Sequence, residues 1–298
     1  MKPQKLGTQT STFGVSQRVN HDSSKFYDSK LYADLKTAKN EEIYEEYPIP
    51  ERYLNTIICH SSEAMKELHN KSIHLMITSP PYNVGKDYDK DLSLTEYLEL
   101  IRTVMKETYR VLVPGGRVAF NVANIGRKPY LPLDSYIMNI MEDIGFLMRG
   151  QIIWDKSASS GVSFAWGSYK SASNPVLRDV HEYILIFSKG TYSRQKNSKK
   201  DSISGDEFRE YTKSIWSFPA ASARKIGHPA PFPEELPSRL IKLYSFEDDV
   251  ILDPFIGSGT TGIAALKLKR NFIGYEVDKN YCNLAKKRIS EVVNQTKL

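Results

Sequence analysis

Short apolar runs alternate with longer amphipathic stretches from about residue 50 onward. Apolar runs of about four to eight residues are typical of buried strands, and their alternation with helical patterns is typical of an α/β protein with a parallel sheet. The runs that fit a strand are residues 55–59, 73–78, 116–122, 151–154, 183–187, 249–253 and 272–276. The hydrophobic pattern therefore predicts an α/β fold.

Two stretches between these runs have the period of an amphipathic helix. In residues 93–112, apolar side chains recur at helical spacing, and the Pro-Gly-Gly at 114–116 predicts where this helix ends. The second helix is predicted over residues 133–144 and should end at Gly145, because glycine favours the backbone conformation that closes a helix.

Three segments have neither period. Residues 1–48 are polar and weakly periodic, which predicts an N-terminal arm. Residues 157–180 and 189–225 are long irregular stretches, and loops of this length in a compact domain are usually functional or disordered. Aromatic and basic side chains are interleaved in both stretches, which favours a contact surface over a linker: Trp166, Tyr169, Lys170, Arg178, Trp216, Arg224 and Lys225.

The composition allows a large core, since 40% of the residues are apolar and 26% are charged. No apolar run reaches the roughly 18 residues of a membrane span, and the first residues lack the apolar stretch of a signal peptide, so a cytoplasmic protein is expected. With only Cys59 and Cys282 present, we expect neither a disulfide framework nor a cysteine-based zinc site, and no other metal site is predicted.

The net charge of +6 and the sequence pI of about 9.0 permit a polyanionic partner without requiring one. Residues 189–200 contain five basic side chains and no acidic one. By composition alone, such a run is more often a solvated loop than a phosphate-binding surface.

The clearest ligand signal is the glycine-rich segment 249–276, D-V-I-L-D-P-F-I-G-S-G-T-T-G followed by a helical stretch and N-F-I-G-Y-E. Glycines let a ligand approach the backbone, and the start of a helix supplies unpaired N–H groups. Glu276, at the end of the second strand, is placed to accept hydrogen bonds from two ribose hydroxyls. The segment therefore predicts a site for an adenosine-containing ligand.

A dinucleotide is the first rival, because Gly257, Gly259 and Gly262 fit G-x-G-x-x-G. Only 22 residues follow Glu276 in the 298-residue chain, too few for the remaining strands of a dinucleotide domain. The sheet must then be completed by upstream strands, which is a permuted arrangement.

The second signal is L-M-I-T-S-P-P-Y-N at residues 75–83, where an apolar strand ends in two prolines and an aromatic residue. Pro80 and Pro81 fix φ and lack N–H donors. The Ser79 hydroxyl and the Pro80 carbonyl then remain as acceptors for an amine, and Tyr82 can stack on a base. Alone, such a sequence is more often an ordinary turn; with the glycine loop in the same sheet, a catalytic turn is favoured.

Together these motifs resemble the β class of DNA amino-methyltransferases, over roughly residues 50–292. The likeness rests on T-S-P-P-Y, on D-P-F-I-G-S-G-T-T, on H-P-A-P-F-P-E-E-L-P-S-R-L-I-K-L at 228–243, and on their permuted order. The resemblance implies a circularly permuted, Rossmann-like methyltransferase fold with a mostly parallel seven-stranded sheet and inserted target-recognition loops. It implies S-adenosyl-L-methionine as cofactor and double-stranded DNA as substrate, with the target base flipped into the pocket.

Site residues follow from the resemblance, position by position. Ser79, Pro80, Pro81 and Tyr82 would form the catalytic turn, with Asn83 ordering its exit. The expected cofactor residues are Ser61, Asp253, Pro254, Phe255, Gly257, Gly259, Thr260 and Glu276. Many relatives have Gly-Asp where this chain has His60-Ser61, so the adenine contact departs from the pattern, and His60 is interpreted as a packed or capping residue.

The resemblance also divides the chain into parts. We expect an arm at 1–48, a catalytic part at 49–156, a recognition loop at 157–180, a sheet strand at 181–190, a target-recognition insertion at 191–226 and a cofactor-binding part at 227–298. In the recognition elements Trp166, Tyr169 and Arg178 would reach bases. Phosphates would be held by Lys196, Lys199 and Lys200.

Serine before Pro-Pro-Tyr resembles the N4-cytosine members, whereas aspartate there resembles most N6-adenine members, so N4-cytosine methylation is predicted and N6-adenine is the alternative. C5 methylation is excluded because neither cysteine follows a proline. A glutamine- or RNA-modifying enzyme, a DNA-binding regulator with a vestigial pocket, and a nicotinamide oxidoreductase are weaker alternatives. A homodimer and a companion restriction endonuclease are compatible with this bacterial or archaeal class, but no residue indicates either.

Overall fold

The computed structural model describes residues 27–33, 35, 37–38, 44–81, 92–159, 167–222 and 232–295. The chain divides into two units, Met1–Thr37 and Ala38–Leu298. Described residues of the first unit include the short helix η1 (Lys30–Tyr32) and an edge-on contact between the rings of Tyr27 and Tyr32. The division comes before the expected boundary at residue 48, so residues 44–48 belong to the second unit.

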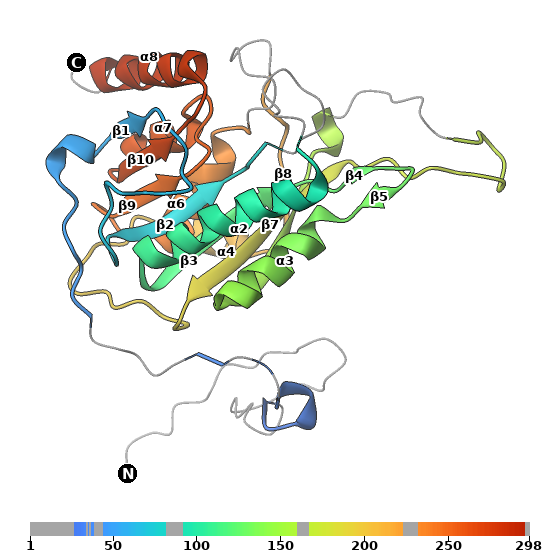
Figure 1. Ribbon diagram of the computed structural model, residues 1–298, viewed down its shortest axis with the longest axis horizontal. Helices are drawn as coiled ribbons and strands as arrows, with labels where there is room; N and C mark the ends of the chain where they lie inside the picture. The colour runs from blue at the N-terminus through green and yellow to red at the C-terminus, as the bar shows by residue number, and fades with distance from the viewer. Residues whose placement is uncertain are drawn as a thin grey trace. The chain divides into compact units, whose positions relative to one another are not determined.

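The second unit is built on one twisted sheet (Figure 1). Within the described residues, its eight strands are ordered β1 (Thr56–Ile58), β10 (Asn271–Tyr275), β9 (Val250–Asp253), β2 (Ile73–Thr78), β3 (Leu112–Val122), β7 (His181–Lys189), β6 (Phe146–Asp155) and β8 (Ile215–Ser217). Only β7 pairs antiparallel with its neighbours, β3 and β6. The predicted mostly parallel α/β sheet is confirmed, and it has one strand more than the seven expected.

The additional strand β8 lies at the edge, parallel to β6, within the segment that was expected to be an insertion. Its three residues are too few to show an alternating pattern. The strand β3 also differs from expectation, since it begins at Leu112 and includes the Pro-Gly-Gly that was predicted to separate helix from strand. A register shift against β2 accommodates these three residues, as a β-bulge does.

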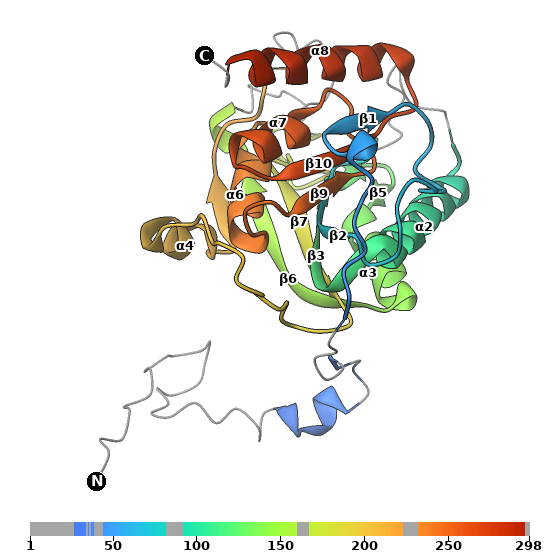
Figure 2. The same ribbon diagram turned by 90° about the vertical axis from the view of Figure 1, so that its left-hand side faces the viewer.

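Two helices cover one face of the sheet (Figure 2). The helix α2 (Leu94–Val111) begins at a capping box in which Ser93 and Glu96 exchange hydrogen bonds. The helix α3 (Leu133–Ile144) ends at Gly145, whose φ of 109° closes the helix as predicted. Both predicted helices are confirmed within one residue at each end.

The other face is covered by α6 (Glu235–Tyr244), α7 (Thr260–Lys267) and α8 (Lys279–Gln295). Successive strand residues point to opposite faces, so Val118 and Phe120 pack beneath α2 and α3 while Ala119 packs on the other side. Both faces of the central strands are therefore buried, which explains why these strands are continuous apolar runs without alternation. A separate two-stranded hairpin, β4 (Ile125–Gly126) and β5 (Tyr130–Leu131), follows β3.

The parallel strands β9 and β2 form the point at which the strand order reverses. From β9 the chain passes through α7 to β10 on one side, and from β2 it passes through α2 to β3 on the other. In open α/β sheets, ligands bind beyond the carboxyl ends of the strands at such a switch point. Asp253 and Thr78 are the last residues of these two strands, so the fold places the expected site beyond them.

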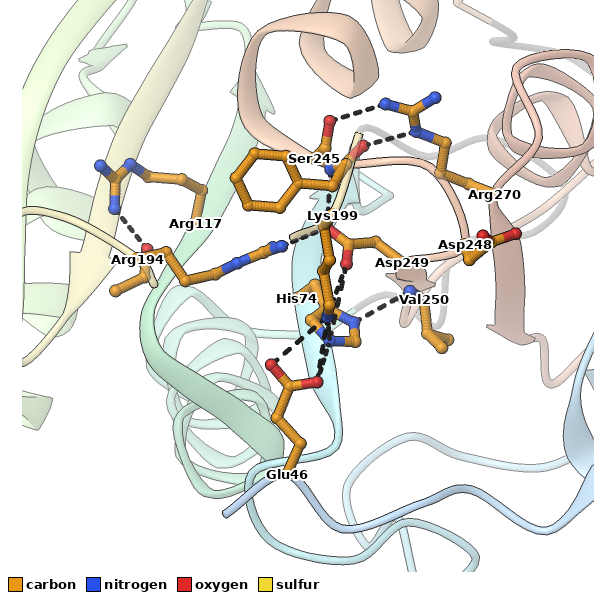
Figure 3. Close-up of polar contacts among 12 residues, drawn as sticks. Glu46, His74, Arg117, Arg194, Lys199, Ser245, Asp248, Asp249, Val250 and Arg270 are labelled. Carbon is orange, nitrogen blue, oxygen red and sulfur yellow. Dashed lines mark hydrogen bonds and ion pairs between the residues drawn. The ribbon is translucent and has the colours of Figure 1, made fainter. Parts of the chain in front are cut away.

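At the opposite end of the same strands lies a buried group of ionic side chains (Figure 3). Asp249, directly before β9, is fully buried and pairs with Arg194 at 2.6 Å and with Lys199 at 3.1 Å. It also accepts a hydrogen bond of 2.7 Å from the Phe246 N–H. These contacts attach the segment that follows β7 to the beginning of β9.

His74, in β2, extends this group toward the segment before β1. Its Nδ1 accepts the Val250 N–H at 2.9 Å, so the ring proton lies on Nε2, which is 3.1 Å from Glu46. The hydrogen bond from His74 and the nearby Lys199 ammonium lower the pKa of Glu46 from 4.5 to about 2, although partial burial opposes them.

The two cysteines lie together although 223 positions separate them. Cys59, after β1, and Cys282, in α8, form a disulfide with Cα atoms 6.1 Å apart. One bridge is not the disulfide framework that the cysteine count argued against. The sequence spacing does not indicate this pair, because the two residues meet only when α8 packs beside β1. Within the described residues, no helix has both the length and the apolar character to cross a membrane, and no three potential ligand side chains are grouped to hold a metal ion.

Asp249→Asn should strongly destabilise the protein. The amide keeps the shape of the side chain but removes the charge that balances Arg194 and Lys199, and breaking a buried ion pair in this way costs about 3–5 kcal/mol. Urea unfolding followed by circular dichroism measures the difference. Asp248→Asn is the matched control, because this exposed neighbour should change the unfolding free energy by less than about 0.5 kcal/mol; equal effects would contradict the assignment.

Candidate active site

One buried carboxylate joins the two predicted motifs. Asp253, at the end of β9, is 1% exposed, and its Oδ1 accepts a 2.7 Å hydrogen bond from the hydroxyl of Thr78, at the end of β2. These residues are 175 positions apart in the chain. Because Ser79 directly follows Thr78 and Pro254 directly follows Asp253, the turn and the glycine loop leave the sheet side by side.

The same carboxylate also organises the glycine loop. Asp253 Oδ2 accepts a 2.6 Å hydrogen bond from the Thr261 hydroxyl in α7, and Oδ1 accepts the Phe255 N–H at 3.1 Å. Burial raises the pKa of Asp253 from 3.8 to about 6, while these donors oppose the rise. The side chain therefore fixes the loop to the catalytic strand from inside the protein.

The segment predicted to form the catalytic turn directly follows β2. Ser79 is half-buried, Pro80 is buried and Pro81 is half-buried, directly after the last residue of β2. Tyr82 and Asn83, predicted to complete the turn, lie outside the described residues. Ser62 brings a third segment to this place, because its buried hydroxyl donates a 2.9 Å hydrogen bond to the Pro254 carbonyl.

The glycine loop has the backbone that its sequence predicted. Gly257 and Gly259 have φ values of 50° and 85°, in the left-handed region that favours glycine. A Cβ at Gly259 would lie 3.1 Å from the Cβ of Ala285 in α8, closer than ordinary van der Waals contact. The loop is therefore held tightly between β9 and α8.

Glu276, at the end of β10, faces this loop. Its Oε2 accepts the Gly257 N–H at 3.0 Å, and its Oε1 accepts the Asp278 N–H at 2.9 Å. Burial raises the pKa of Glu276, and the two N–H groups oppose the rise. Each carboxylate oxygen can accept two hydrogen bonds, so the donors present fit an adenosine ligand whose two ribose hydroxyls use the remaining positions.

The hydroxyl groups of Ser61 and Thr260 each have a partner within the protein. Their predicted contacts with the cofactor stay predictions. The Ser61 hydroxyl donates to Glu63 at 2.6 Å. Thr260 is buried at the start of α7, where its hydroxyl oxygen lies 3.4 Å from Arg288 of α8. Arg288 also donates to the Ser258 carbonyl.

His60 behaves as a packing residue. Its ring lies 5.5 Å from that of Tyr275 at a tilted angle, and Nε2 is 2.8 Å from a carboxylate oxygen of Glu67. Hydrogen bonds to the Ser61 carbonyl and to Glu67 raise the pKa of His60. The second oxygen of Glu67 accepts the Tyr275 hydroxyl at 3.0 Å, so Glu67 links the exposed ring of His60 to the buried Tyr275.

Sequence reasoning missed a polar chain beside the catalytic turn. Asn121 Nδ2, in β3, lies 3.2 Å from Ser79 Oγ and 2.5 Å from Oε2 of Glu182, in β7. Lys156, directly after β6, pairs with Oε1 of Glu182. These side chains come from the ends of neighbouring strands, and the sequence signal that could have found them is a polar residue at the end of an otherwise apolar strand.

The predicted recognition loop lies at the same end of the sheet. Residues 167–180 precede β7, and Figure 1 shows them extending beyond the β4–β5 hairpin. Arg127 of that hairpin pairs with Asp179 at 2.8 Å and donates to the Leu177 carbonyl at 3.0 Å. Tyr169 is 64% exposed and Arg178 is exposed. Trp166 lies outside the described residues.

The structure does not bring the three predicted phosphate-binding lysines to this end. They follow β7, which is antiparallel to β3, so they lie where β2 and β9 begin. Lys199 pairs with Glu46 and Asp249 (Figure 3). Lys196 pairs with Asp201, and the Lys200 carbonyl accepts the Glu247 N–H. The three lysines are therefore left out of the DNA-facing surface considered below.

The permuted mostly parallel sheet, the proline turn and the glycine loop with its acidic partner together define an S-adenosyl-L-methionine-dependent methyltransferase. A family model described as DNA methylase (N6_N4_Mtase) matches residues 73–287. The chain therefore belongs to the N6/N4 family of DNA methylases, and it is a DNA methyltransferase that uses S-adenosyl-L-methionine.

Named relatives agree with this assignment. The chain is 33% identical to the type II methyltransferase M.MjaI of Methanocaldococcus jannaschii over 78% of its own length and 90% of that protein. It is 29% identical to M.ScaI of Streptomyces caespitosus, with 95% and 92% covered.

Solved structures agree as well. TTHA0409 of Thermus thermophilus, assigned as a DNA modification methylase and solved with S-adenosyl-L-methionine, superposes with a TM-score of 0.65 at 29% identity, covering 80% of this chain and 95% of that one. The cytosine-N4-specific PvuII DNA methyltransferase has the same fold, with a TM-score of 0.63 at 19% identity and coverages of 80% and 91%.

The pKa of Asp253 predicts a pH-dependent stability. Between pH 3.8 and 6 the unfolded state holds fewer protons at this carboxyl than the folded state, so its contribution to stability falls as the pH rises. Asp253→Asn, which resembles the neutral acid, removes this dependence. As the pH rises from 4.5 to 7.5, the unfolding free energy of the wild type should fall by about 2 kcal/mol relative to that of the variant. Parallel pH curves would refute this.

Proposed function

We propose that the protein transfers a methyl group from S-adenosyl-L-methionine to the N4 amine of a cytosine in duplex DNA. The observation that supports this best is the contact between Thr78 and Asp253, because it places the serine turn beside the cofactor loop. The bound cofactor supplies an electrophilic methyl group on a sulfonium. The amine nitrogen forms a bond to the methyl carbon as the bond from that carbon to sulfur breaks, which leaves a neutral thioether, and the amine proton is released to water.

The amine is a poor nucleophile because its lone pair is delocalised into the ring. A fixed acceptor that binds one amine N–H favours a geometry in which the lone pair is exposed, and preorganised polar groups of this kind are usually the largest catalytic contribution. The Pro80 carbonyl is such an acceptor, since two prolines fix the turn. In a duplex the amine is paired and stacked, so the base must leave the helix to reach this turn.

Serine favours cytosine over adenine as the target. The residue that precedes Pro-Pro-Tyr is a neutral serine in this chain, whereas most N6-adenine members have an aspartate there. The Ser79 hydroxyl also has a neutral amide, Asn121, as its neighbour. N6-adenine methylation is the second candidate, because both bases present an amine next to a ring nitrogen.

Ser79→Ala should lower kcat by about 10²–10³-fold, the usual loss when one preorganised hydrogen-bonding group is removed. Binding of S-adenosyl-L-methionine should change little, because Asp253 and Glu276 are untouched. Tritium transfer from labelled cofactor to DNA measures kcat, and calorimetry measures cofactor binding. Ser135→Ala, an exposed serine on α3, is the matched control.

Mass spectrometry of nucleosides from the methylated DNA identifies the base. N4-methylcytosine is the expected product, and methyladenosine alone would refute the cytosine assignment. A chain that binds DNA and cofactor but transfers no tritium would be a regulator with an inactive pocket.

For the DNA surface, the strongest support comes from the exposed loop 167–180 at the carboxyl end of the sheet. The Lys170 ammonium lies over the ring of Tyr169, 5.3 Å from its centre. The loop therefore presents a cation beside an aromatic ring that can contact a nucleobase. Arg178 lies in the same loop, three residues before β7 begins. This loop is therefore the proposed target-recognition element, and it is fixed to the body by Arg127.

Neutralising Lys170 and Arg178 together, each to Gln, should weaken DNA binding and make log K fall less steeply with log salt concentration, because two cations are removed from the surface that faces the polyanion. Fluorescence anisotropy over a series of salt concentrations measures both quantities. The control changes Lys196 and Lys200 to Gln, removing the same charge from the opposite end of the sheet. If the control shows the larger loss, DNA binds at that end instead.

A further inference from the structure

The polar chain at the catalytic turn fixes the direction of a hydrogen bond. Asn121 is 1% exposed, and its side-chain nitrogen Nδ2 lies within hydrogen-bond distance of both Ser79 Oγ and Glu182 Oε2. An ionised carboxylate has acceptors only, so the NH₂ end of the amide must face Glu182. The second hydrogen of this NH₂ group is then donated to the Ser79 oxygen.

Glu182 is in turn held in place and neutralised. Its side chain is 13% exposed, and Lys156 binds the carboxylate oxygen that Asn121 does not use. A buried carboxylate that has both a cation and an amide donor is satisfied, so it can fix the amide without an uncompensated charge. The orientation of Asn121 therefore follows from a fixed partner on β7.

This direction has a consequence for Ser79. A serine hydroxyl has one hydrogen and two lone pairs, and Asn121 occupies a lone pair. The hydroxyl hydrogen therefore points to a partner other than Asn121. An amide NH₂ group also cannot take up a proton, so Ser79 cannot pass a proton through Asn121 to Glu182. Ser79 stays a neutral hydroxyl whose donor side faces away from β3.

We propose that this hydroxyl donates its hydrogen bond to the ring nitrogen next to the target amine, while the Pro80 carbonyl accepts an amine N–H. The inference rests on the proposed function and specifies how the site recognises its substrate. Cytosine presents an amine at position 4 beside an acceptor nitrogen at position 3, which matches a carbonyl beside a donating hydroxyl. Guanine and thymine present a carbonyl oxygen beside an N–H, which is the opposite pattern.

Asn121 and Glu182 are positioning residues in this scheme, because they act through Ser79 without touching the base. The site selects any base edge with an amine next to an acceptor nitrogen, so adenine fits the same rule. Ser79 thus contributes to selection against guanine and thymine as well as to catalysis.

The test replaces the acceptor nitrogen in the substrate. The wild-type enzyme methylates a duplex that carries either cytosine or 3-deazacytosine at the modified position, and the ratio of the two kcat/KM values is measured. The same ratio is then measured for Ser79→Ala. Comparing the two ratios cancels the different intrinsic reactivity of the analogue. The wild-type ratio is expected to exceed that of the variant by about 10-fold, the usual effect of one hydrogen bond.

A second variant reverses the direction of the hydrogen bond between Ser79 and residue 121 by exchanging the amide and the carboxylate of Asn121 and Glu182. In Asn121→Asp/Glu182→Gln, the carboxylate lies next to Ser79 and takes the hydroxyl hydrogen, while the amide moves to β7. This variant should lose the preference for cytosine over 3-deazacytosine, as Ser79→Ala does. Glu182→Gln alone removes the acceptor-only partner of Asn121, because Lys156 takes the remaining oxygen and leaves an NH₂ group facing Asn121. This variant should therefore also weaken the preference. Calorimetric binding of S-adenosyl-L-methionine shows that each variant is folded.

Equal ratios in the wild type and Ser79→Ala, or a double variant that keeps the wild-type preference, would overturn the inference. The proposed function fails separately, because methyladenosine in the digest would refute the cytosine assignment. In that case adenine and 1-deazaadenine replace cytosine and 3-deazacytosine in the comparison of wild type with Ser79→Ala. Mass spectrometry thus tests the target base, and the kcat/KM ratios test the hydrogen bond from Ser79.

Discussion

The site depends on a single carboxylate that is out of contact with solvent. Asp253 holds the end of β2, the beginning of the glycine loop and the first turn of α7 through three hydrogen bonds. A buried carboxylate is costly unless donors surround it, so these three partners cannot move independently of one another. The relative position of the proline turn and the glycine loop is therefore set from within the core, and under the proposed function these two segments hold the amine and the methyl donor.

Much of the fold was predictable because it depends on burial. Central strands such as residues 73–78 are buried on both faces, so the sequence shows them as mostly apolar runs. Gly145 ends a helix at a positive φ that favours glycine, so the sequence also marks the end of that helix. The strand β8 and the strand character of Pro-Gly-Gly in β3 were missed because tertiary pairing, not local pattern, decides them.

The site was predictable only where a motif is contiguous. Ser79, Gly257 and Glu276 lie where their motifs placed them, whereas Asn121 and Glu182 are single polar residues in apolar strands and have no meaning until β3 and β7 pair. The basic run after β7 depends on topology in the same way. The family resemblance, not its composition, led to the prediction that its lysines hold phosphates, but an antiparallel strand carries the run to the far end of the sheet, where Lys199 pairs with Asp249.

The order of strands also governs how the molecule can assemble. The strand β1 pairs with β10, and β2 pairs with β9, so the first two strands of the sheet are separated in space by two strands from the end of the chain. The edges of β1 and β2 therefore stay unpaired until β9 and β10 insert between them. Long-range pairing of this kind is intrinsically slow, and the strand edges that it leaves unpaired favour aggregation.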